Sequence, residues 1–575
     1  MKKKTLLRVA ALLKNRSAQL LASILLAAAS VMLSLYIPIL FGKAIDEIVA
    51  EGINFSAIFS FLSRAGAIIL ASALLQWIMG AINNRVVFET VRTVRQQAFE
   101  NIERLPLRYI DGHAYGDLLS RVISDADQFA DGLLLGFSQF FTGIVTIFTT
   151  LGFMLSIAPG VAAVAALLTP LSIFVAKFIA SNTHSLFKKQ SEIRGEQTAL
   201  IDEMVGGASV VAAYGYRARA SKRFEKVNRE LETTTRRATF ISSLVNPCTR
   251  FVNALVYAAV CLVGAMAVIA GKMTVGGLSA ILSYATQYAK PFNEISGVVT
   301  ELQNAIVCAK RLFELIDEPP EPSDEGLPSL PEISGNVGIR SVCFSYSPDK
   351  PLIRNFDLNV RPGQRVAIVG PTGCGKTTLI NLLMRFYDVD SGEITVEGEN
   401  IAGVTRKSLR RGFGMVLQDT WLCSGTIRDN IVMGKPDATD EEIVSAAKAT
   451  HAHSFIRRLP QGYDTPVGEG GGNLSAGQKQ LLCITRVMLS APPMLILDEA
   501  TSSIDAKTEL RVQRAFEKLM KDKTSFIVAH RLSTIMSADL ILVMKNGNVV
   551  EQGTHAELMK KGGFYAELYN SQFAH

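Results

Sequence analysis

The residues best suited to do chemistry form a glycine-rich segment, Gly370 to Thr377 (GPTGCGKT). Glycines let backbone N–H groups curl around an anion, and the lysine and hydroxyl that end the segment offer a cation and a metal ligand. A strand-like run, Arg365 to Val369, precedes it and a helix-like run, Thr378 to Arg385, follows it. This context predicts a phosphate-binding loop, in which Lys376 reaches the β- and γ-phosphates of ATP and Thr377 ligates Mg²⁺. The predicted nucleotide-binding residues here are Gly370, Thr372, Gly373, Cys374, Gly375, Lys376, Thr377 and Thr378.

Two neighbouring carboxylates end a second strand-like run, Met494 to Leu497. Asp498 suits the Mg²⁺ shell, which it would reach through water, and Glu499 suits a general base that orients the attacking water. One acid at the end of a strand is common, but two of them in a chain with a phosphate loop predict ATP hydrolysis.

Between these two motifs lies Asn473 to Gln478 (NLSAGQ), ahead of a helix-like run. This segment resembles the LSGGQ signature of the ATP-binding cassette (ABC) transporter family. The resemblance covers nearly the whole chain, because all the motifs follow in the family's order and spacing. It implies an ATPase coupled to movement of a substance across a membrane.

The resemblance implies roles for further residues around the ATP molecule. Tyr346 stacks on adenine, Gln418 touches Mg²⁺ and senses the membrane domain, and His530 contacts the γ-phosphate. The implied catalytic residues are thus Glu499, His530 and Gln418, and the implied metal ligands are Thr377, Gln418 and Asp498. The residues implied at the interface with a partner subunit, where the partner's ATP is bound, are Ser475, Gly477, Gln478 and Asp505.

Besides a conservative change in the segment Ser502 to Asp505 (SSID), two positions depart from the family's pattern. Ala476 stands where the signature usually has a second glycine, and Cys423 replaces an aromatic residue after Gln418. The intact Ser475 and Gly477 lead us to expect that function survives the first change. The sequence leaves the effect of the second open.

The first half of the chain contains long uncharged stretches. Ser17 to Gly42 would form a helix of roughly 39 Å, enough to cross the hydrocarbon core of a bilayer. The longest stretch, Gly132 to Ala176, contains Pro159-Gly160 near its middle and predicts two spans joined by a tight turn. About six spans are expected in all, the others lying near 65–84, 251–271 and 273–289.

Charged loops give the expected orientation. The basic, amphipathic residues 2 to 16 and the basic connections 85–131 and 177–250 are expected inside, which places both termini in the cytoplasm. The formal net charge of +7 is explained by this inner face, so no nucleic acid partner is expected. Two segments in the long inner connections, Tyr109 to Asp117 and Gly206 to Tyr214, resemble the coupling helices of the exporter family.

The predicted fold is a multidomain membrane protein, with an all-α six-span transmembrane domain followed by an α/β P-loop ATP-binding cassette domain. An acidic, proline-rich stretch marks the boundary. The expected domains are residues 1–315, a linker at 316–334, and the cassette at 335–575. This order, membrane domain first, resembles the type IV exporter half-transporters.

The resemblance also bears on partners and cargo. A single phosphate loop and a single signature imply a dimer with a second half-transporter. The stretch 474–509 looks especially like the catalytically complete subunit of bacterial heterodimeric multidrug exporters, which favours a heterodimer over a homodimer. The expected setting is the bacterial cytoplasmic membrane, and the expected cargo is a small hydrophobic or amphipathic compound such as a drug.

Other functions stay open or are excluded by particular features. A lipid or peptide translocator and an importer of metal chelates (siderophores) would share these motifs. A soluble cassette ATPase acting on DNA or ribosomes is excluded by the predicted spans. A membrane sensor that only binds ATP is disfavoured, because both Lys376 and Glu499 are present.

Overall fold

The computed structural model describes residues 2–50, 53–347, 349–418, 420–498, 506–529 and 532–573. It divides into two compact units, one made of Met1–Arg104 with Tyr115–Glu318 and one of Leu105–Ala114 with Pro319–His575. The first unit is helical and the second is α/β, as the sequence predicts. The short segment Leu105–Ala114, which overlaps the predicted first coupling helix, belongs to the second unit.

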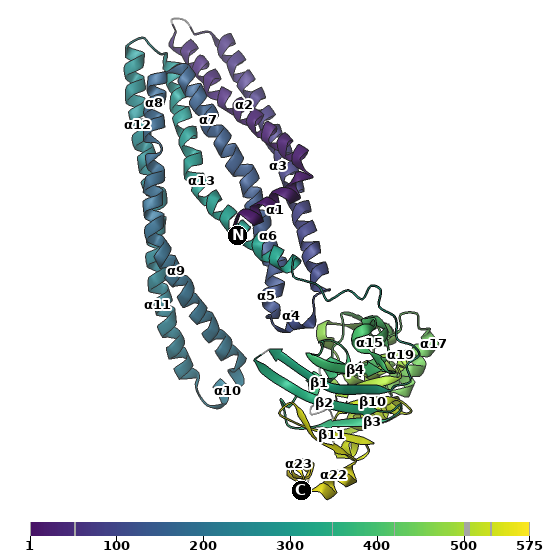
Figure 1. Ribbon diagram of the computed structural model, residues 1–575. Coiled ribbons are helices and arrows are strands. Elements are labelled where there is room, and N and C mark those ends of the chain that lie inside the picture. Colours follow the sequence, from purple (N-terminus) through teal and green to yellow (C-terminus); the bar gives the residue numbers. More distant parts are fainter. Residues whose placement is uncertain are drawn as a thin grey trace. The chain divides into compact units, whose positions relative to one another are not determined.

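The first unit consists of long helices (Figure 1). Those of its N-terminal half are α1 (Lys2–Lys14), α2 (Ser17–Val49), α3 (Phe55–Ile102), α5 (Tyr115–Ser120), α6 (Ala126–Leu135) and α7 (Phe141–Ile157), with π-helical turns η1 (Arg121–Asp125) and η2 (Gly136–Phe140) on either side of α6. Those of its C-terminal half are α8 (Pro159–Leu168), α9 (Leu171–Gly206), α10 (Ala208–Ala213), α11 (Arg217–Ser243), α12 (Val245–Ile269) and α13 (Val275–Ile316).

Four helical stretches of the described chain are long and apolar enough to cross a membrane. They are Ser17–Val49, Phe55–Ile102, Tyr115–Ile157 and Arg217–Ile269. The two remaining predicted spans fall on α8 with the start of α9, and on α13. The count of six stays a prediction. The predicted turn lies between α7 and α8, where Ala158 has an extended backbone and Pro159 begins the next helix.

Small residues let α2 and α13 approach closely. A Cβ atom added to Gly42 would lie 2.5 Å from the carbonyl oxygen of Gly276, so neither position has room for a side chain. The Gly276 N–H donates to Asp46 Oδ1 at 2.7 Å, and the Tyr284 hydroxyl donates to the Leu35 carbonyl in the same interface. Close backbone contact joined by interhelical hydrogen bonds is how helices associate where lipid supplies no hydrophobic driving force.

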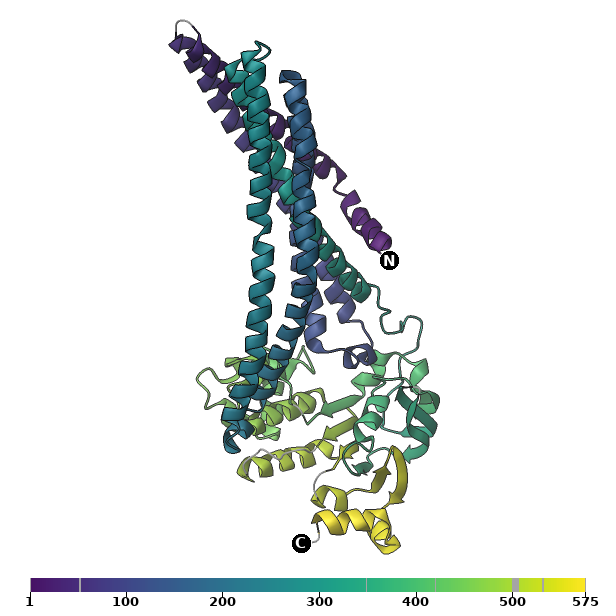
Figure 2. The same ribbon diagram turned by 90° about the vertical axis from the view of Figure 1, so that its left-hand side faces the viewer.

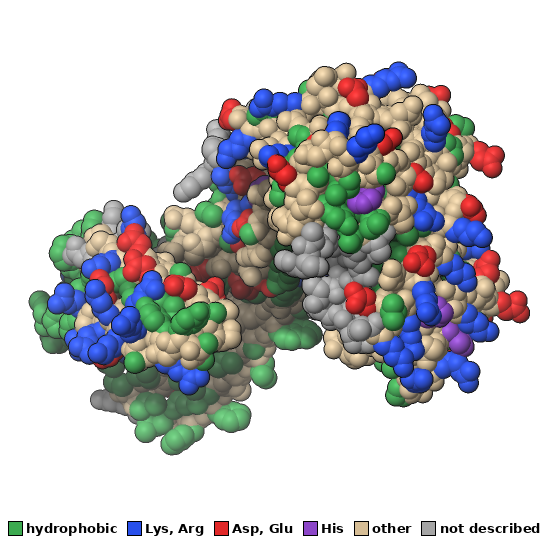
Figure 3. All heavy atoms as spheres, turned by 90° about the horizontal axis from the view of Figure 1, so that it is seen from below, with side chains coloured by type: hydrophobic (Ala, Val, Ile, Leu, Met, Phe, Trp, Pro, Cys, Tyr) green, Lys and Arg blue, Asp and Glu red, His purple; other side chains and the backbone are tan. Residues whose placement is uncertain are grey.

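The helices α9 and α11 run side by side, with the short α10 at their end (Figures 1 and 2). α10 coincides with the second segment that resembles a coupling helix. Lys and Arg side chains gather on this end of the unit (Figure 3). Its exposed cations include Arg217, Arg219, Lys222, Arg223 and Lys226.

The second unit contains two larger sheets and a small one. The antiparallel sheet has the order β2-β1-β4-β5, and the mainly parallel sheet has the order β12-β11-β3-β10-β9-β6. The strands are β1 (Val337–Ser347), β2 (Lys350–Val360), β3 (Arg365–Val369), β4 (Ser391–Val396), β5 (Glu399–Asn400), β6 (Phe413–Val416), β9 (Met494–Asp498), β10 (Thr524–Val528), β11 (Leu540–Lys545) and β12 (Asn548–Gly553), with β7 (Gly425–Thr426) pairing with β8 (Pro466–Val467).

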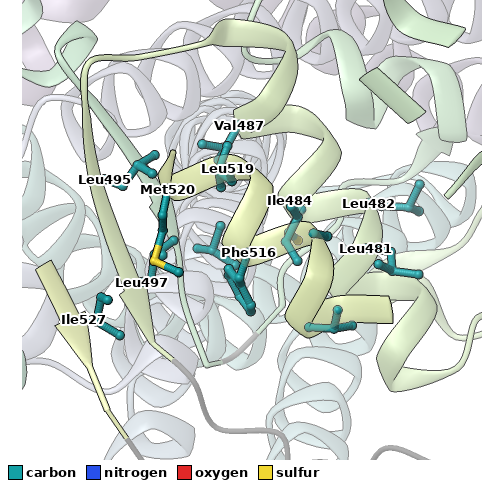
Figure 4. Packing of buried hydrophobic residues seen from close by; sticks show 14 of the residues in the cluster. Leu481, Leu482, Ile484, Val487, Leu495, Leu497, Phe516, Leu519, Met520 and Ile527 are labelled. Atoms are coloured by element: carbon teal, nitrogen blue, oxygen red, sulfur yellow. The ribbon is translucent and has the colours of Figure 1, made fainter. Parts of the chain in front are cut away.

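Helices cover the parallel sheet, and both of its faces are buried. Alternate residues of β9 join different cores: Leu495 and Leu497 pack with α19 and α20, whereas Ile496 packs toward the antiparallel sheet (Figure 4). A parallel strand buried on both faces reads as a continuous apolar run, which is why this one was predictable. The helices are α4 (Leu107–Asp111), α14 (Lys376–Leu383), α15 (Arg406–Arg411), α16 (Ile427–Val432), α17 (Asp440–Ala449), α18 (His453–Ile456), α19 (Ala476–Ser490), α20 (Ala506–Met520), α21 (Leu532–Met536), α22 (His555–Lys561) and α23 (Phe564–Phe573), besides three short 3₁₀ turns at 401–403, 462–464 and 469–471.

Candidate nucleotide site

The carboxyl ends of the parallel strands bring the predicted site residues to one edge of the sheet. β10 lies between β3 and β9, with Val528 level with Ile368 on one side and Asp498 on the other. Adjacent strands are about 4.8 Å apart, so the ends of β3 and β9 are separated by roughly 10 Å. Ligands of open α/β sheets bind at this edge.

The loop after β3 has the backbone that its glycines predict. Gly375 caps α14 in a left-handed conformation, φ 102°, which glycine adopts without strain. A Cβ atom on Gly370 would lie 2.3 Å from the carbonyl oxygen of Met544 at the end of β11, so this position has no room for a side chain. The Lys376 ammonium donates to the carbonyls of Gly370 and Pro371, at 2.8 and 3.1 Å, and therefore lies against the loop that it terminates.

The side chains that follow in the loop and the first turn of α14 divide between core and surface. Cys374 is buried, 3% exposed, and packs in the core of the antiparallel sheet, so it can meet a phosphate only through its backbone. The Thr377 hydroxyl is exposed at the N-terminus of α14, whereas Thr378 is buried. Thr377 and Asp498 thus offer hard oxygen donors at one sheet edge, a donor set that suits Mg²⁺.

Tyr346 lies beside the phosphate-binding helix. Its hydroxyl donates to Thr378 Oγ1 at 3.1 Å, and 40% of the residue is exposed. Phe344 and Tyr387 pack edge-on against its ring, with centroids 4.9 and 5.1 Å away. The part of the ring that stays exposed is available to a flat apolar ligand such as adenine.

The segment Leu105–Ala114 reaches this aromatic cluster through residue pairs that the sequence did not identify. The Tyr387 hydroxyl donates to Asp111 Oδ2 at 2.5 Å, and the Arg108 guanidinium donates to the Tyr346 carbonyl at 2.9 Å. Burial, then the Asp111 carboxylate, raises the pKa of Tyr387, so its hydroxyl stays protonated near neutral pH. No local sequence signal could have paired Asp111 with a residue 276 positions away.

The signature residues form the N-terminus of a fifteen-residue helix, α19. Ser475 is its N-cap: the Ser475 Oγ accepts from the Gln478 N–H at 3.3 Å, and the Gln478 Oε1 accepts from the Ser475 N–H at 2.9 Å. This capping box was visible in the sequence as a serine followed three residues later by glutamine. The Ser475 hydroxyl hydrogen remains a donor, and a helix N-terminus favours an anion. Gly477 is buried, and the methyl group of Ala476 is exposed.

The remaining predicted residues lie at the same sheet edge or outside the described residues. Gln418 is exposed, two positions after β6 ends. The neighbouring loop is pinned by Asn430, whose Nδ2 donates to the Cys423 carbonyl at 3.0 Å and whose Oδ1 accepts from the Cys423 N–H at 3.0 Å. Glu499, Asp505 and His530 lie outside the described residues.

Comparison with protein families gives two matches that cover the two units. Residues 20–292 match the family model described as ABC transporter transmembrane region, and residues 353–502 match the one described as ABC transporter. Both matches agree with the helical first unit and with the loop, strand ends and capped helix of the second.

Curated relatives and a solved structure extend over most of the chain. A fatty acid ABC transporter ATP-binding/permease protein of Mycobacterium bovis is 44% identical over 526 residues, 92% of this chain and 83% of the relative. A putative multidrug export ATP-binding/permease protein of Staphylococcus aureus is 37% identical over 87% of this chain and 85% of its own. The structure of a bacterial Atm1-family ABC exporter with ATP bound aligns at a TM-score of 0.78 and 29% identity, covering 98% of this chain and 99% of that one.

Proposed function

This chain belongs to the ABC transporter family, with the ATP-binding and permease domains of an exporter half-transporter, and on that premise we propose that it exports hydrophobic or amphipathic compounds from the cytoplasm or inner leaflet of the bacterial cytoplasmic membrane. One observation supports the ATP-driven part of this proposal most strongly. The phosphate loop after β3, Asp498 at the end of β9 and Gln418 just after β6 lie along one sheet edge, while a capped helix N-terminus offers Ser475 to an anion. We place both chain termini in the cytoplasm, on the same side as the basic end of α9 and α11.

The residues divide the work of hydrolysis. Backbone N–H groups from Gly370 to Thr378 hold the phosphates, Lys376 neutralises their charge, and Tyr346 stacks on adenine. Thr377, Asp498 and Gln418 would hold a Mg²⁺ ion, which would supply neutralisation of phosphate charge. Glu499 accepts a proton from the attacking water and His530 contacts the γ-phosphate.

A second half-transporter completes each site. Ser475, Gly477 and Gln478, at the N-terminus of α19, bind the γ-phosphate on the partner's phosphate loop, and Asp505 crosses the interface. ATP bound in this way closes the dimer, and hydrolysis releases it, which alternates the access of the membrane domain. The partner is a different half-transporter in the arrangement favoured by the sequence and a second copy in the alternative.

Inside-out vesicles test the export function. Vesicles that contain this chain alone are given ATP and a lipophilic dye, with Glu499→Gln as the control that binds ATP but lacks the base. ATP-dependent uptake that the control loses supports export by a homodimer. If uptake is lacking, the chain is expressed together with a candidate partner half-transporter. Lack of uptake in both preparations, with ATP hydrolysis intact, contradicts the proposed cargo class.

A further inference from the structure

A cavity between α12 and α13 carries a single charged side chain. Its volume is about 410 Å³, within the range of small-molecule sites. Three of the residues that line it are alanines, and the polar ones are Asn253, Tyr257, Thr286, Gln287 and Lys290. Each of these polar side chains can donate a hydrogen bond, and the described lining contains no carboxylate. The cavity, here called the headgroup cavity, therefore suits a ligand with a negative charge.

Lys290 also borders a second cavity, of about 360 Å³, formed by α2, α3, α7 and α13. Glu294, one helical turn further on, lines only this second cavity. Its Oε1 lies 3.9 Å from the Lys290 ammonium, beyond hydrogen-bond distance, and the side chains are 75% and 51% exposed for Lys290 and Glu294. The lysine thus keeps donor capacity for a ligand in the headgroup cavity.

The position of Lys290 makes its charge informative. It follows Val275, the first residue of α13, by 15 residues, or roughly 22 Å of helix, and so lies next to the end of the span expected at 273–289. A charged side chain beside a membrane span faces a polar cavity, a protein partner or the interface, because exposure to lipid is costly. Ser283, Gln287 and Glu294 share its helical face at intervals of three, four or seven residues, so a polar stripe runs along α13.

Asn253 and Pro291 place groups that can form further hydrogen bonds near Lys290. The amide oxygen of Asn253 is buried and has no hydrogen-bond partner among the described residues. A buried amide oxygen without a partner costs free energy. Rotation of the Asn253 side-chain amide by 180° would exchange this oxygen for the NH₂ group, which can donate hydrogen bonds. Pro291 follows Lys290 and has no N–H for the carbonyl of Gln287, and α13 bends along its length (Figure 1).

We propose that the headgroup cavity binds the carboxylate of a single-chain amphiphile, with Lys290 as its ion-pair partner. One lysine balances one negative charge, which favours a monoanionic headgroup such as a carboxylate. The alanines lining the cavity leave apolar surface for the start of the alkyl chain. This inference rests on the proposed function, because it specifies the cargo class of the same exporter.

Equilibrium binding to the full-length chain in phosphatidylcholine nanodiscs tests the assignment without ATP. The probes are radiolabelled palmitate, hexadecanol and hexadecylamine, which share one chain and differ in headgroup charge. We expect palmitate to bind most tightly. Lys290→Gln should weaken palmitate binding at least about tenfold and change hexadecanol binding little. Lys290→Arg should retain palmitate binding, and thermal midpoints establish that each variant is folded.

Glu294→Gln is the matched control on the same helical face. It should bind palmitate at least as tightly as the unmodified chain, because the competing carboxylate is gone. The proposal is overturned if Lys290→Gln binds palmitate normally, or if this variant loses binding of all three probes in proportion. It is also overturned if Glu294→Gln weakens palmitate binding as much as Lys290→Gln does, because that result indicates a site for a zwitterionic headgroup. Displacement of palmitate by equimolar phosphatidylglycerol also overturns the carboxylate assignment.

The test separates this inference from the exporter proposal. Lys290-dependent binding without ATP-dependent uptake of palmitate in vesicles contradicts export and leaves the site intact. ATP-dependent uptake of a neutral dye together with Lys290-independent palmitate binding contradicts the site and leaves export intact.

Discussion

Replacing Tyr387 by phenylalanine removes one hydroxyl and tests whether it fastens Leu105–Ala114 to the ATP-binding unit. The change keeps the ring that packs edge-on against Tyr346 and deletes the 2.5 Å hydrogen bond to Asp111. A hydrogen bond to a charged group contributes about 1.5–3 kcal/mol. Asp111 is exposed and can regain water when the hydroxyl is lost, so we expect about 1 kcal/mol, roughly a fivefold change in the docking equilibrium.

Hydrogen exchange measures that equilibrium directly. Amide protection of residues 105–114 should fall roughly fivefold in Tyr387→Phe, while that of the strands β3 and β9 stays the same. Because this segment connects the membrane helices to the aromatic cluster, stimulation of ATP hydrolysis by cargo should also fall, with smaller change in unstimulated hydrolysis.

Tyr463→Phe provides the matched control. Its hydroxyl also makes a polar contact, 2.9 Å from His453 Nδ1, and both residues belong to the same unit. Unchanged exchange at 105–114 in Tyr387→Phe, or the same loss in Tyr463→Phe, would refute the reasoning.

Three further changes probe the site and its support. Gly370→Ala places a Cβ 2.3 Å from the Met544 carbonyl and should destabilise the unit by about 3 kcal/mol, measured as a lower thermal midpoint with ATP binding lost; normal binding would contradict the tight approach. Ser475→Ala removes the N-cap of α19, which should cost about 1 kcal/mol of stability and lower the thermal midpoint by about 2–4 °C. Unchanged stability would show that the capping box of Ser475 and Gln478 does not stabilise the unit. Burial alone would raise the pKa of Glu397, but hydrogen bonds from residues 334–336 outweigh it and lower that pKa. The stability that the Glu397 carboxylate contributes is therefore present above roughly pH 4.3 and is lost as the pH falls through the lowered pKa. The difference in thermal midpoint between the unmodified chain and Glu397→Gln should therefore shrink below about pH 4. A difference that grows on acidification would contradict a lowered pKa for Glu397.

Much of the local structure of the candidate nucleotide site was predictable because its signals are local. The loop from Gly370 to Lys376 needs particular backbone conformations at fixed spacing, and those requirements are written into neighbouring residues. The apolar run before Asp498 likewise identifies a buried parallel strand without knowledge of its partners. The break at Pro159 was found for the same reason, since proline begins a helix readily.

Other features depend on contacts between residues far apart in the chain. The hydrogen bond between Asp111 and Tyr387, and the membership of Leu105–Ala114 in the second unit, follow from tertiary packing. Whether Lys290 faces a cavity also depends on how α13 is rotated, which apolar composition does not determine. A second interruption, between Leu168 and Leu171, falls at Pro170 inside the run expected to form one span.

The central claim is that two half-transporters share each ATP site, and nucleotide retention by mixed dimers tests it most directly. Chains that carry Glu499→Gln to block hydrolysis are combined in differently tagged pairs, one with Lys376→Ala and one with Ser475→Arg, and mixed dimers are isolated through both tags. Dimers uniform in either variant should retain no ATP after gel filtration, because every site lacks one half. The mixed dimer has one intact phosphate loop facing one intact signature and should retain one ATP per dimer. Retention of ATP by the uniform Ser475→Arg dimer, or none by the mixed dimer when the dimer that carries Glu499→Gln alone retains two, would contradict the shared site.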